Sequence, residues 1–127
     1  MAALGPALES ELQARRKRLG ELFEAHNKRV GGFGWWFHDE RPWPNEISLV
    51  HVARAAERER EGACKRIVTH AVDARNPAHL AALIKLFESG KVESAGYYQD
   101  RSIKVFFGGT AAEFAEFVSA HKIPAKN

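Results

Sequence analysis

The sequence predicts a single-domain α+β protein, a two-layer sandwich in which helices cover one side of a sheet. Three observations lead to this prediction. The chain has 127 residues, the length of one ordinary domain. Its 45% hydrophobic and 28% charged residues are typical of globular proteins. Apolar residues at helical spacing alternate along the chain with short runs of β-branched and aromatic residues. We expect one domain over 1–127 that folds without disulfides or metal.

The chain is predicted to begin with a long amphipathic helix over 7–30. Pro6 is well placed at its start, and Gly31 and Gly32 end it. Its apolar residues recur at spacings of three, four and seven and form one stripe: Leu8, Leu12, Leu19, Leu22 and Phe23. Such a stripe is typical of a helix that lies on the surface of a domain.

The segment 31–61 is predicted to be an aromatic-rich strand followed by a connection. It holds all three tryptophans of the chain, which are Trp35, Trp36 and Trp43. Residues 33–38 predict a strand, because aromatic side chains favour pleated surfaces. Pro42 and Pro44 then force an extended backbone.

Two segments in the middle of the chain fit both a strand and a helix. Residues 46–62 carry a helical apolar stripe, yet 47–52 alone fit a strand, which we favour at the start of this segment. Residues 65–74 are rich in β-branched residues and predict a strand, although a helical stripe is present there as well. Periodicity alone does not separate these alternatives.

From residue 63 to 123 the predicted order is strand, helix, strand, strand, helix. Asn76-Pro77 starts the first helix as a cap and a first-turn proline, and Ser89-Gly90 closes it. Residues 92–98 and 102–107 predict two strands joined by a tight turn near 100–101. Thr110 and Glu113 have the spacing of a capping box at the start of the last helix. The residues that share the apolar faces of the two helices are Leu80, Leu83, Ile84, Phe87, Phe114, Phe117, Val118 and His121.

This order of elements is that of a ferredoxin-like βαββα sandwich. The strand that would complete such a sheet is expected from 33–38 or from 46–53. Pro124 is predicted to end the last helix, and 124–127 to form a loose tail.

The composition and the first residues argue against a secreted, disulfide-bonded or membrane-spanning protein. Cys64 is the only cysteine, so an internal disulfide and a thiolate zinc cluster are excluded, and a lone thiol fits a reducing compartment. The N-terminus does not have the basic and apolar regions of a secretory signal. No apolar run approaches the roughly 18 residues of a membrane span. We therefore expect a cytoplasmic protein that does not contact a membrane and carries no cofactor.

A basic run and several aromatic residues make nucleic acid a candidate partner. The net charge is +3, and four cations are adjacent: Arg15, Arg16, Lys17 and Arg18. Such a run attracts polyanions, but it is also typical of the solvated face of a helix. The stretch 80–107 resembles the RNA-recognition domain in its order of elements, which implies that Phe106 or Phe107 stacks on a base. The partner strand 66–72 has no aromatic residue, so membership is not inferred. A nucleic-acid site would combine the basic run with Tyr97, Tyr98 and Phe106.

The histidines and the glycine-containing loop do not predict a catalytic or metal site. The six histidines are His26, His38, His51, His70, His79 and His121, and no pair of them has HExxH spacing. His38-Asp39-Glu40 with His51 and His70 could converge if their strands are neighbours, but we predict no metal. Cys64 and His70 would lie about 20 Å apart on one strand, which favours a buried thiol over a nucleophile. Gly108-Gly109-Thr110 could hold an anion at a helix start, but an ordinary strand-to-helix turn is favoured.

The aromatic segment is the strongest candidate for function. On a strand the adjacent Trp35 and Trp36 face opposite sides, and Trp43 lies between two prolines. Exposed tryptophan is typical of binding hot spots, and Arg41 lies beside these rings. We therefore expect a non-catalytic binding module that recognises a protein or a nucleic acid. Two alternatives remain open: a small-molecule-binding protein or small enzyme with His and Arg in a pocket beside the sheet, and a subunit of a homo-oligomer.

Overall fold

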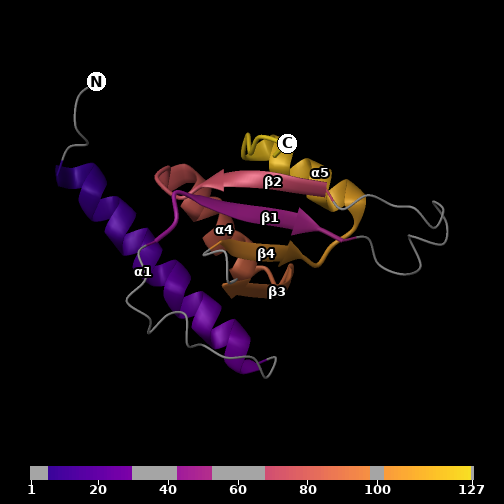
Figure 1. Cartoon of the computed structure of the whole chain (residues 1–127), viewed down its shortest axis with the longest axis horizontal. Helices are drawn as coiled ribbons and strands as arrows, with labels where there is room; N and C mark the ends of the chain where they lie inside the picture. Colours follow the sequence, from indigo (N-terminus) through magenta and orange to yellow (C-terminus); the bar gives the residue numbers. More distant parts are fainter. Residues whose placement is uncertain (1–5, 30–42, 53–67, 98–101, 127) are drawn as a thin grey trace.

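The computed structural model describes residues 6–29, 43–52, 68–97 and 102–126. Within these ranges it has three helices and four strands, which places the protein in the α+β class. The helices are α1 (Pro6–Arg29), α4 (Pro77–Glu88) and α5 (Ala111–Ala120). The strands are β1 (Glu46–His51), β2 (Val68–Asp73), β3 (Val92–Tyr97) and β4 (Ile103–Phe107). Figure 1 shows the sheet in front of α4 and α5, while α1 runs obliquely past one end of the sheet.

The four strands form one mixed sheet in the order β2-β1-β4-β3. β1 is antiparallel to β2 and parallel to β4, and β3 is antiparallel to β4. The predicted order of strand, helix, strand, strand, helix is therefore present from β2 to α5, and the ambiguous segment at 46–51 is a strand. It lies between β2 and β4, so the helix α4 crosses two strands on its way from β2 to β3. The finer ferredoxin-like assignment stays a prediction. The sheet of that fold is entirely antiparallel, whereas β1 and β4 pair in parallel here. The strand predicted at 33–38 lies outside the described residues.

The core lies between the sheet and the helices α4 and α5. Alternation along the strands brings Ile47 and Leu49 of β1 to the same side as their neighbours in β2 and β4. These neighbours, and the helix residues that cover them, are all buried: Val72, Ile103, Val105, Leu80, Leu83, Phe87, Phe114 and Val118. Burial of Leu83, Phe87 and Phe114 confirms the prediction for the two helices, whereas Phe117 is only half-buried.

The N-terminal helix α1 packs against α4 and the edge strand β3. Its predicted apolar stripe supplies the contact, because Leu12, Leu19 and Phe23 are buried while most exposed positions between them are polar or charged. The ring of Phe23 meets Phe87 of α4 edge to face, with centroids 4.8 Å apart. The seam between α1 and α4 is therefore closed by apolar side chains.

Local signals start both C-terminal helices as predicted. The side chain of Asn76 accepts a hydrogen bond from the Ala78 amide at 2.9 Å, and Pro77 occupies the first turn. Thr110 and Glu113 form a complete capping box, with backbone-to-side-chain distances of 2.9 and 3.1 Å.

The C-terminal residues correct the prediction of a loose tail. Helix α5 ends at Ala120, and Lys122 then takes a left-handed φ of 54° that turns the chain. The amide of Ala71 donates to the Pro124 carbonyl, and the amide of Lys126 donates to the Thr69 carbonyl, both at 2.9 Å. The tail thus pairs with the outer edge of β2, because an edge strand has amides and carbonyls that need partners.

Candidate functional site

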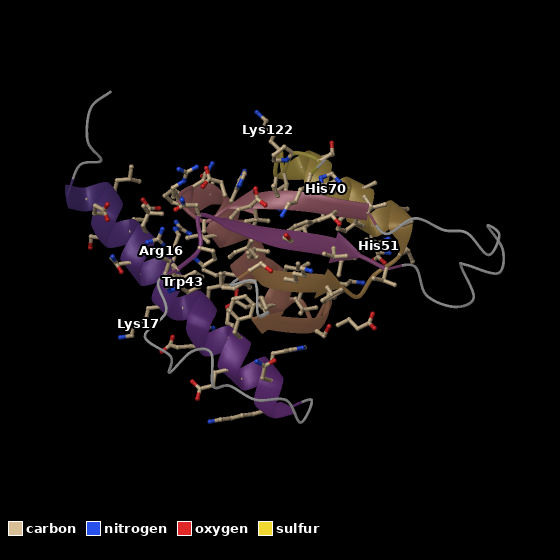
Figure 2. The ribbon with its side chains drawn as sticks, in the orientation of Figure 1. Arg16, Lys17, Trp43, His51, His70 and Lys122 are labelled. Atoms are coloured by element: carbon tan, nitrogen blue, oxygen red, sulfur yellow. The ribbon has the colours of Figure 1, made fainter. Side chains whose placement is uncertain are left out.

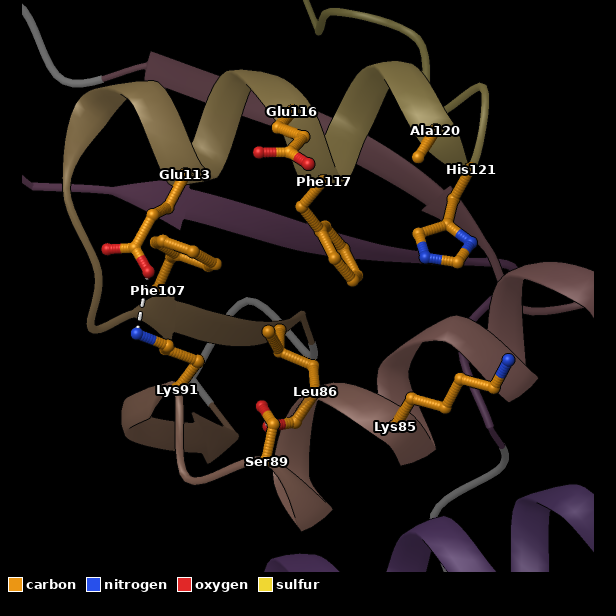
Figure 3. A pocket seen from close by; sticks show the side chains of 10 residues that line it. All are labelled: Lys85, Leu86, Ser89, Lys91, Phe107, Glu113, Glu116, Phe117, Ala120 and His121. Carbon is orange, nitrogen blue, oxygen red and sulfur yellow. Dashed lines mark hydrogen bonds and ion pairs between the residues drawn. The ribbon is translucent and has the colours of Figure 1, made fainter.

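A groove of about 390 Å³ lies between α4 and α5 and is the strongest candidate site in the described part of the chain. Figure 3 shows the side chains that converge on it from the two helices, from the end of β4 and from the turn after α4. They are Lys85, Leu86, Ser89, Lys91, Phe107, Glu113, Glu116, Phe117, Ala120 and His121.

The floor of the groove is apolar. Alternation along β4 turns Phe107 toward the helices, where only 2% of its surface is exposed. Leu86 of α4 and Phe117 of α5 flank it, and the Phe107 and Phe117 ring centroids are 6.3 Å apart. Phe107 therefore forms the covered bottom of the hollow, and the half-buried ring of Phe117 supplies accessible apolar surface above it.

One end of the groove is closed by an ion pair. The Nζ of Lys91 lies 2.6 Å from Oε2 of Glu113, and Figure 3 shows this contact beside Phe107. The hydrogen bond from Lys91, with a second from the Thr110 amide, lowers the pKa of Glu113 to about 2. This end of the groove therefore holds two charges that neutralise each other at neutral pH.

The other end carries a lysine and a histidine without a carboxylate partner. His121 caps α5 and its ring lies 4.7 Å from that of Phe117, while Lys85 extends from the last turn of α4 toward the same end (Figure 3). Glu116 is exposed on the rim. Within the part of the chain that the structure describes, neither Lys85 nor Glu116 forms an ion pair. These groups are free to meet charges on a ligand.

The predicted basic run is mostly engaged in contacts within the protein. Arg16 donates two hydrogen bonds to the Ala74 carbonyl, at 3.0 and 3.3 Å, and so ties α1 to the end of β2. Arg15 pairs with Glu11 at 2.7 Å, and Arg18 pairs with Glu88 of α4 at 3.2 Å. Lys17 is exposed and has no ion pair among the described residues (Figure 2). The run does not present four free cations to a polyanion.

The structure describes some of the aromatic residues that were predicted to bind a partner. Trp43 is half-buried and packs against the main core, close to α1 (Figure 2). Phe106 is half-buried on the sheet face that points away from α5, whereas Phe107 belongs to the core and the groove floor. The structure gives the backbone of Tyr97 in β3, opposite Ile103. The candidates Trp35, Trp36, Arg41 and Tyr98 lie outside the described residues.

Four of the five described histidines hold the fold together. His51 is 2% exposed, donates from Nε2 to the Gly109 carbonyl at 3.2 Å and stacks on Phe114. His70 donates from Nδ1 to the Ile123 carbonyl at 3.0 Å and meets the same phenyl ring. Nδ1 of His79 accepts the Asp73 amide at 3.0 Å, and His26 packs on Phe87.

No metal-binding cluster is present in the described residues, since no three His, Cys, Asp or Glu side chains there could hold an ion. His38, Asp39, Glu40 and Cys64, which entered the alternative predictions, lie outside those residues.

The loop before α5 is the strand-to-helix turn that the sequence favoured. The Thr110 amide, which could have met an anion, donates instead to the Glu113 carboxylate. Gly109 is required here by close packing, because a Cβ at this position would overlap the ring of Phe107. The loop therefore shapes the groove floor and does not form an anion site.

Sequence reasoning did not single out the rim of the groove. Lys85, Lys91 and Glu116 look like ordinary surface charges in the sequence. A weak signal was available in α5, where Glu113, Glu116 and Ala120 follow each other at helical spacing beside Phe117. A polar flank next to a large apolar residue indicates a helix edge that no neighbouring helix covers.

Comparisons with known proteins give no family for this chain. No family model matches it, and neither the curated proteins nor the solved structures include a significant match. Among the described residues, no helix combines the length and the hydropathy that crossing a membrane requires.

Proposed function

We propose that this protein is a non-catalytic binding module and that the groove between α4 and α5 receives a polypeptide segment of a protein partner. The observation that carries the proposal is the gap in the helix layer. It leaves the half-buried ring of Phe117 accessible above the buried ring of Phe107, inside a charged rim. An apolar centre surrounded by polar residues is the usual anatomy of a protein interface.

The shape of the groove favours a polypeptide over a small molecule. Lys85, Ser89, Glu116 and Ala120 line the groove and are exposed, so the hollow is open along its rim. A small ligand typically needs a site that buries about 70–90% of its surface. A polypeptide segment can insert one side chain and gain further contact area along the rim.

The charges favour a protein over a nucleic acid. The groove carries charges of both signs, since Glu113 and Glu116 line it together with Lys85 and Lys91. Strong binding to a phosphate backbone requires several unpaired cations on one surface. In the basic run, only Lys17 lacks an ion pair or a hydrogen-bonded partner within the described residues.

The aromatic segment remains a proposed second part of the partner surface. Trp43 packs on the core with part of its ring accessible, and Trp35, Trp36 and Arg41 precede it in the sequence. Tryptophan is enriched at binding hot spots, so this segment would add a second, separate contact area to that of the groove.

Selection from a phage-displayed library of random 12-residue peptides tests the proposal. Ala120→Trp should block the groove, because Ala120 lines it and is exposed. The matched control is Ala115→Trp, an exposed alanine of the same helix that does not line the groove. We expect peptides that bind the wild type and the control but bind Ala120→Trp at least tenfold more weakly. Enrichment of no peptide, or only of peptides that bind all three proteins equally, would reject the groove as the binding site.

A further inference from the structure

The two ends of the groove differ in electrostatic character. At one end the Lys91–Glu113 pair, at 2.6 Å, leaves little net charge for a ligand to meet. At the other end Lys85 and His121 have no carboxylate among the lining residues drawn beside them in Figure 3. The groove therefore has an apolar middle, a neutral end and an end that attracts anions.

We infer that the partner segment is acidic and apolar: a large aliphatic or aromatic side chain rests on Phe117, above the buried Phe107, and a nearby carboxylate binds at Lys85 and His121. This inference rests on the proposed function, since it names the chemistry of the segment that the groove receives. The two parts of the site lie next to each other, because the His121 ring contacts Phe117 with centroids 4.7 Å apart.

The apolar floor strengthens the charge contact. When an apolar side chain covers Phe117, it displaces water from the neighbouring end of the groove, where Lys85 lies. Coulomb attraction grows as the effective dielectric constant falls, so Lys85 attracts a carboxylate more strongly in the filled groove than in open solvent. An acidic residue within one helical turn of the anchor gains from both contacts at once.

Glu116 determines where along the groove the partner's carboxylate can lie. It is exposed on the α5 rim and has no ion pair in the described part of the chain. A carboxylate placed over the middle of the groove would face this like charge, which disfavours that register. The acidic residue of the partner is therefore directed to the Lys85 and His121 end, and the position facing Glu116 is left to a neutral or basic residue.

The experiment uses the peptide pool that Ala120→Trp fails to bind. We expect these groove-dependent peptides to be enriched in Asp or Glu within four positions of Leu, Phe, Tyr or Trp. Lys85→Glu should weaken the best acidic peptide at least tenfold, and changing its acidic residue to Lys should restore binding to Lys85→Glu. The control is Lys17→Glu, an equal charge change at an exposed position of α1, which should leave affinity within twofold.

Each failure has a distinct meaning. Groove-dependent peptides without acidic enrichment, or without charge-swap rescue, would overturn this inference and leave the proposed function intact. Absence of groove-dependent peptides would reject both. Two other occupants are tested in parallel: a dimer that Ala120→Trp converts to monomer in sedimentation, or a labelled single-stranded oligonucleotide that Ala120→Trp no longer binds, would each overturn the assignment to an acidic peptide.

Discussion

Helix α4 has two flanks that differ in how they are covered. On one flank α1 closes the seam with Leu12, Leu19 and Phe23, and the Phe23 and Phe87 rings meet at 4.8 Å. On the other flank α5 stands off, and a groove of about 390 Å³ remains above Phe107. Both flanks belong to one helix on one sheet, so the difference comes from the helices that face it.

The sequences of the two facing helices explain the difference. Helix α1 presents large apolar side chains at helical spacing, which can fill a seam between helices. Helix α5 turns Phe114 and Val118 into the core, while Glu113, Glu116, Ala120 and His121 line its edge toward α4. At this edge Glu116 and Ala120 stay exposed and do not pack against α4, so the seam remains open. Stability is thus concentrated on the α1 side and accessible apolar surface on the α5 side.

The largest expected effect compares one phenylalanine from each flank. Phe23 has no exposed surface, so Phe23→Ala should leave a cavity and lower the free energy of unfolding by about 3–5 kcal/mol. Phe117 is half-buried at the groove, and Phe117→Ala should cost roughly 1 kcal/mol. Urea denaturation measures both values. Equal losses for the two variants would contradict the contrast between a closed and an open flank.

Replacing Trp43 tests whether this residue contributes to stability like the buried Phe23 or behaves like an exposed residue. The sequence favours an exposed Trp43. For such a residue, replacement by Ala would lower the free energy of unfolding by less than about 1 kcal/mol. The structure packs Trp43 against the core while leaving it half-buried. We therefore expect Trp43→Ala to lower the free energy of unfolding by about 2 kcal/mol, short of full core loss. Thermal and urea unfolding of this variant beside Phe23→Ala give the comparison.

The adjacent residues Arg16 and Lys17 of α1 should differ sharply in how much they contribute to the free energy of unfolding. Arg16 is half-buried and donates two hydrogen bonds to the Ala74 carbonyl, so Arg16→Ala should cost about 1.5 kcal/mol of unfolding free energy. Lys17 is exposed, and Lys17→Ala should stay within about 0.5 kcal/mol. The pair is a matched control for the loss of one positive charge. If Lys17→Ala proved as costly as Arg16→Ala, the structural role of Arg16 would be wrong.

The smallest effect concerns the pH dependence of stability at the groove. The pKa of Glu113 falls from 4.5 to about 2 in the folded protein because of Lys91 and the Thr110 amide. Its contribution is therefore present above about pH 4.5 and is lost as the pH falls toward about 2. Glu113→Gln keeps a side chain able to complete the capping box but removes this titration. The stability difference between wild type and variant should shrink over that pH range; a constant difference would contradict the ion pair.

Local and long-range features of this fold were unequally predictable. The helix starts at Asn76-Pro77 and at Thr110 depend on residues two or three positions apart, and the structure confirms them. Strand β1 was ambiguous because Ile47 to His51 are all buried, and a central strand covered on both faces shows no alternation. The tail at 124–127 was predicted to be loose, and the bonds that hold 124 and 126 escaped prediction because their partner β2 lies about fifty residues away in the sequence.

The groove was the feature that short stretches of sequence predicted least. Phe117 has the same helical spacing as core residues, and only the separation of α4 from α5 leaves it at a rim. Likewise Arg16 looks like part of a solvated basic run until the fold brings the Ala74 carbonyl within 3.0 Å. Such roles are set by the arrangement of helices on the sheet, which spacing within one helix does not specify.

The most direct test of this account is an NMR map of the groove. A peptide selected on the wild type and lost on Ala120→Trp is titrated into the ¹⁵N-labelled protein while amide shifts are followed. The account predicts the largest shifts within 85–91 and 113–121, on the open flank of α4, and little change at Leu12, Leu19 and Phe23. Shifts concentrated along the α1 seam, with the groove amides unchanged, would contradict it.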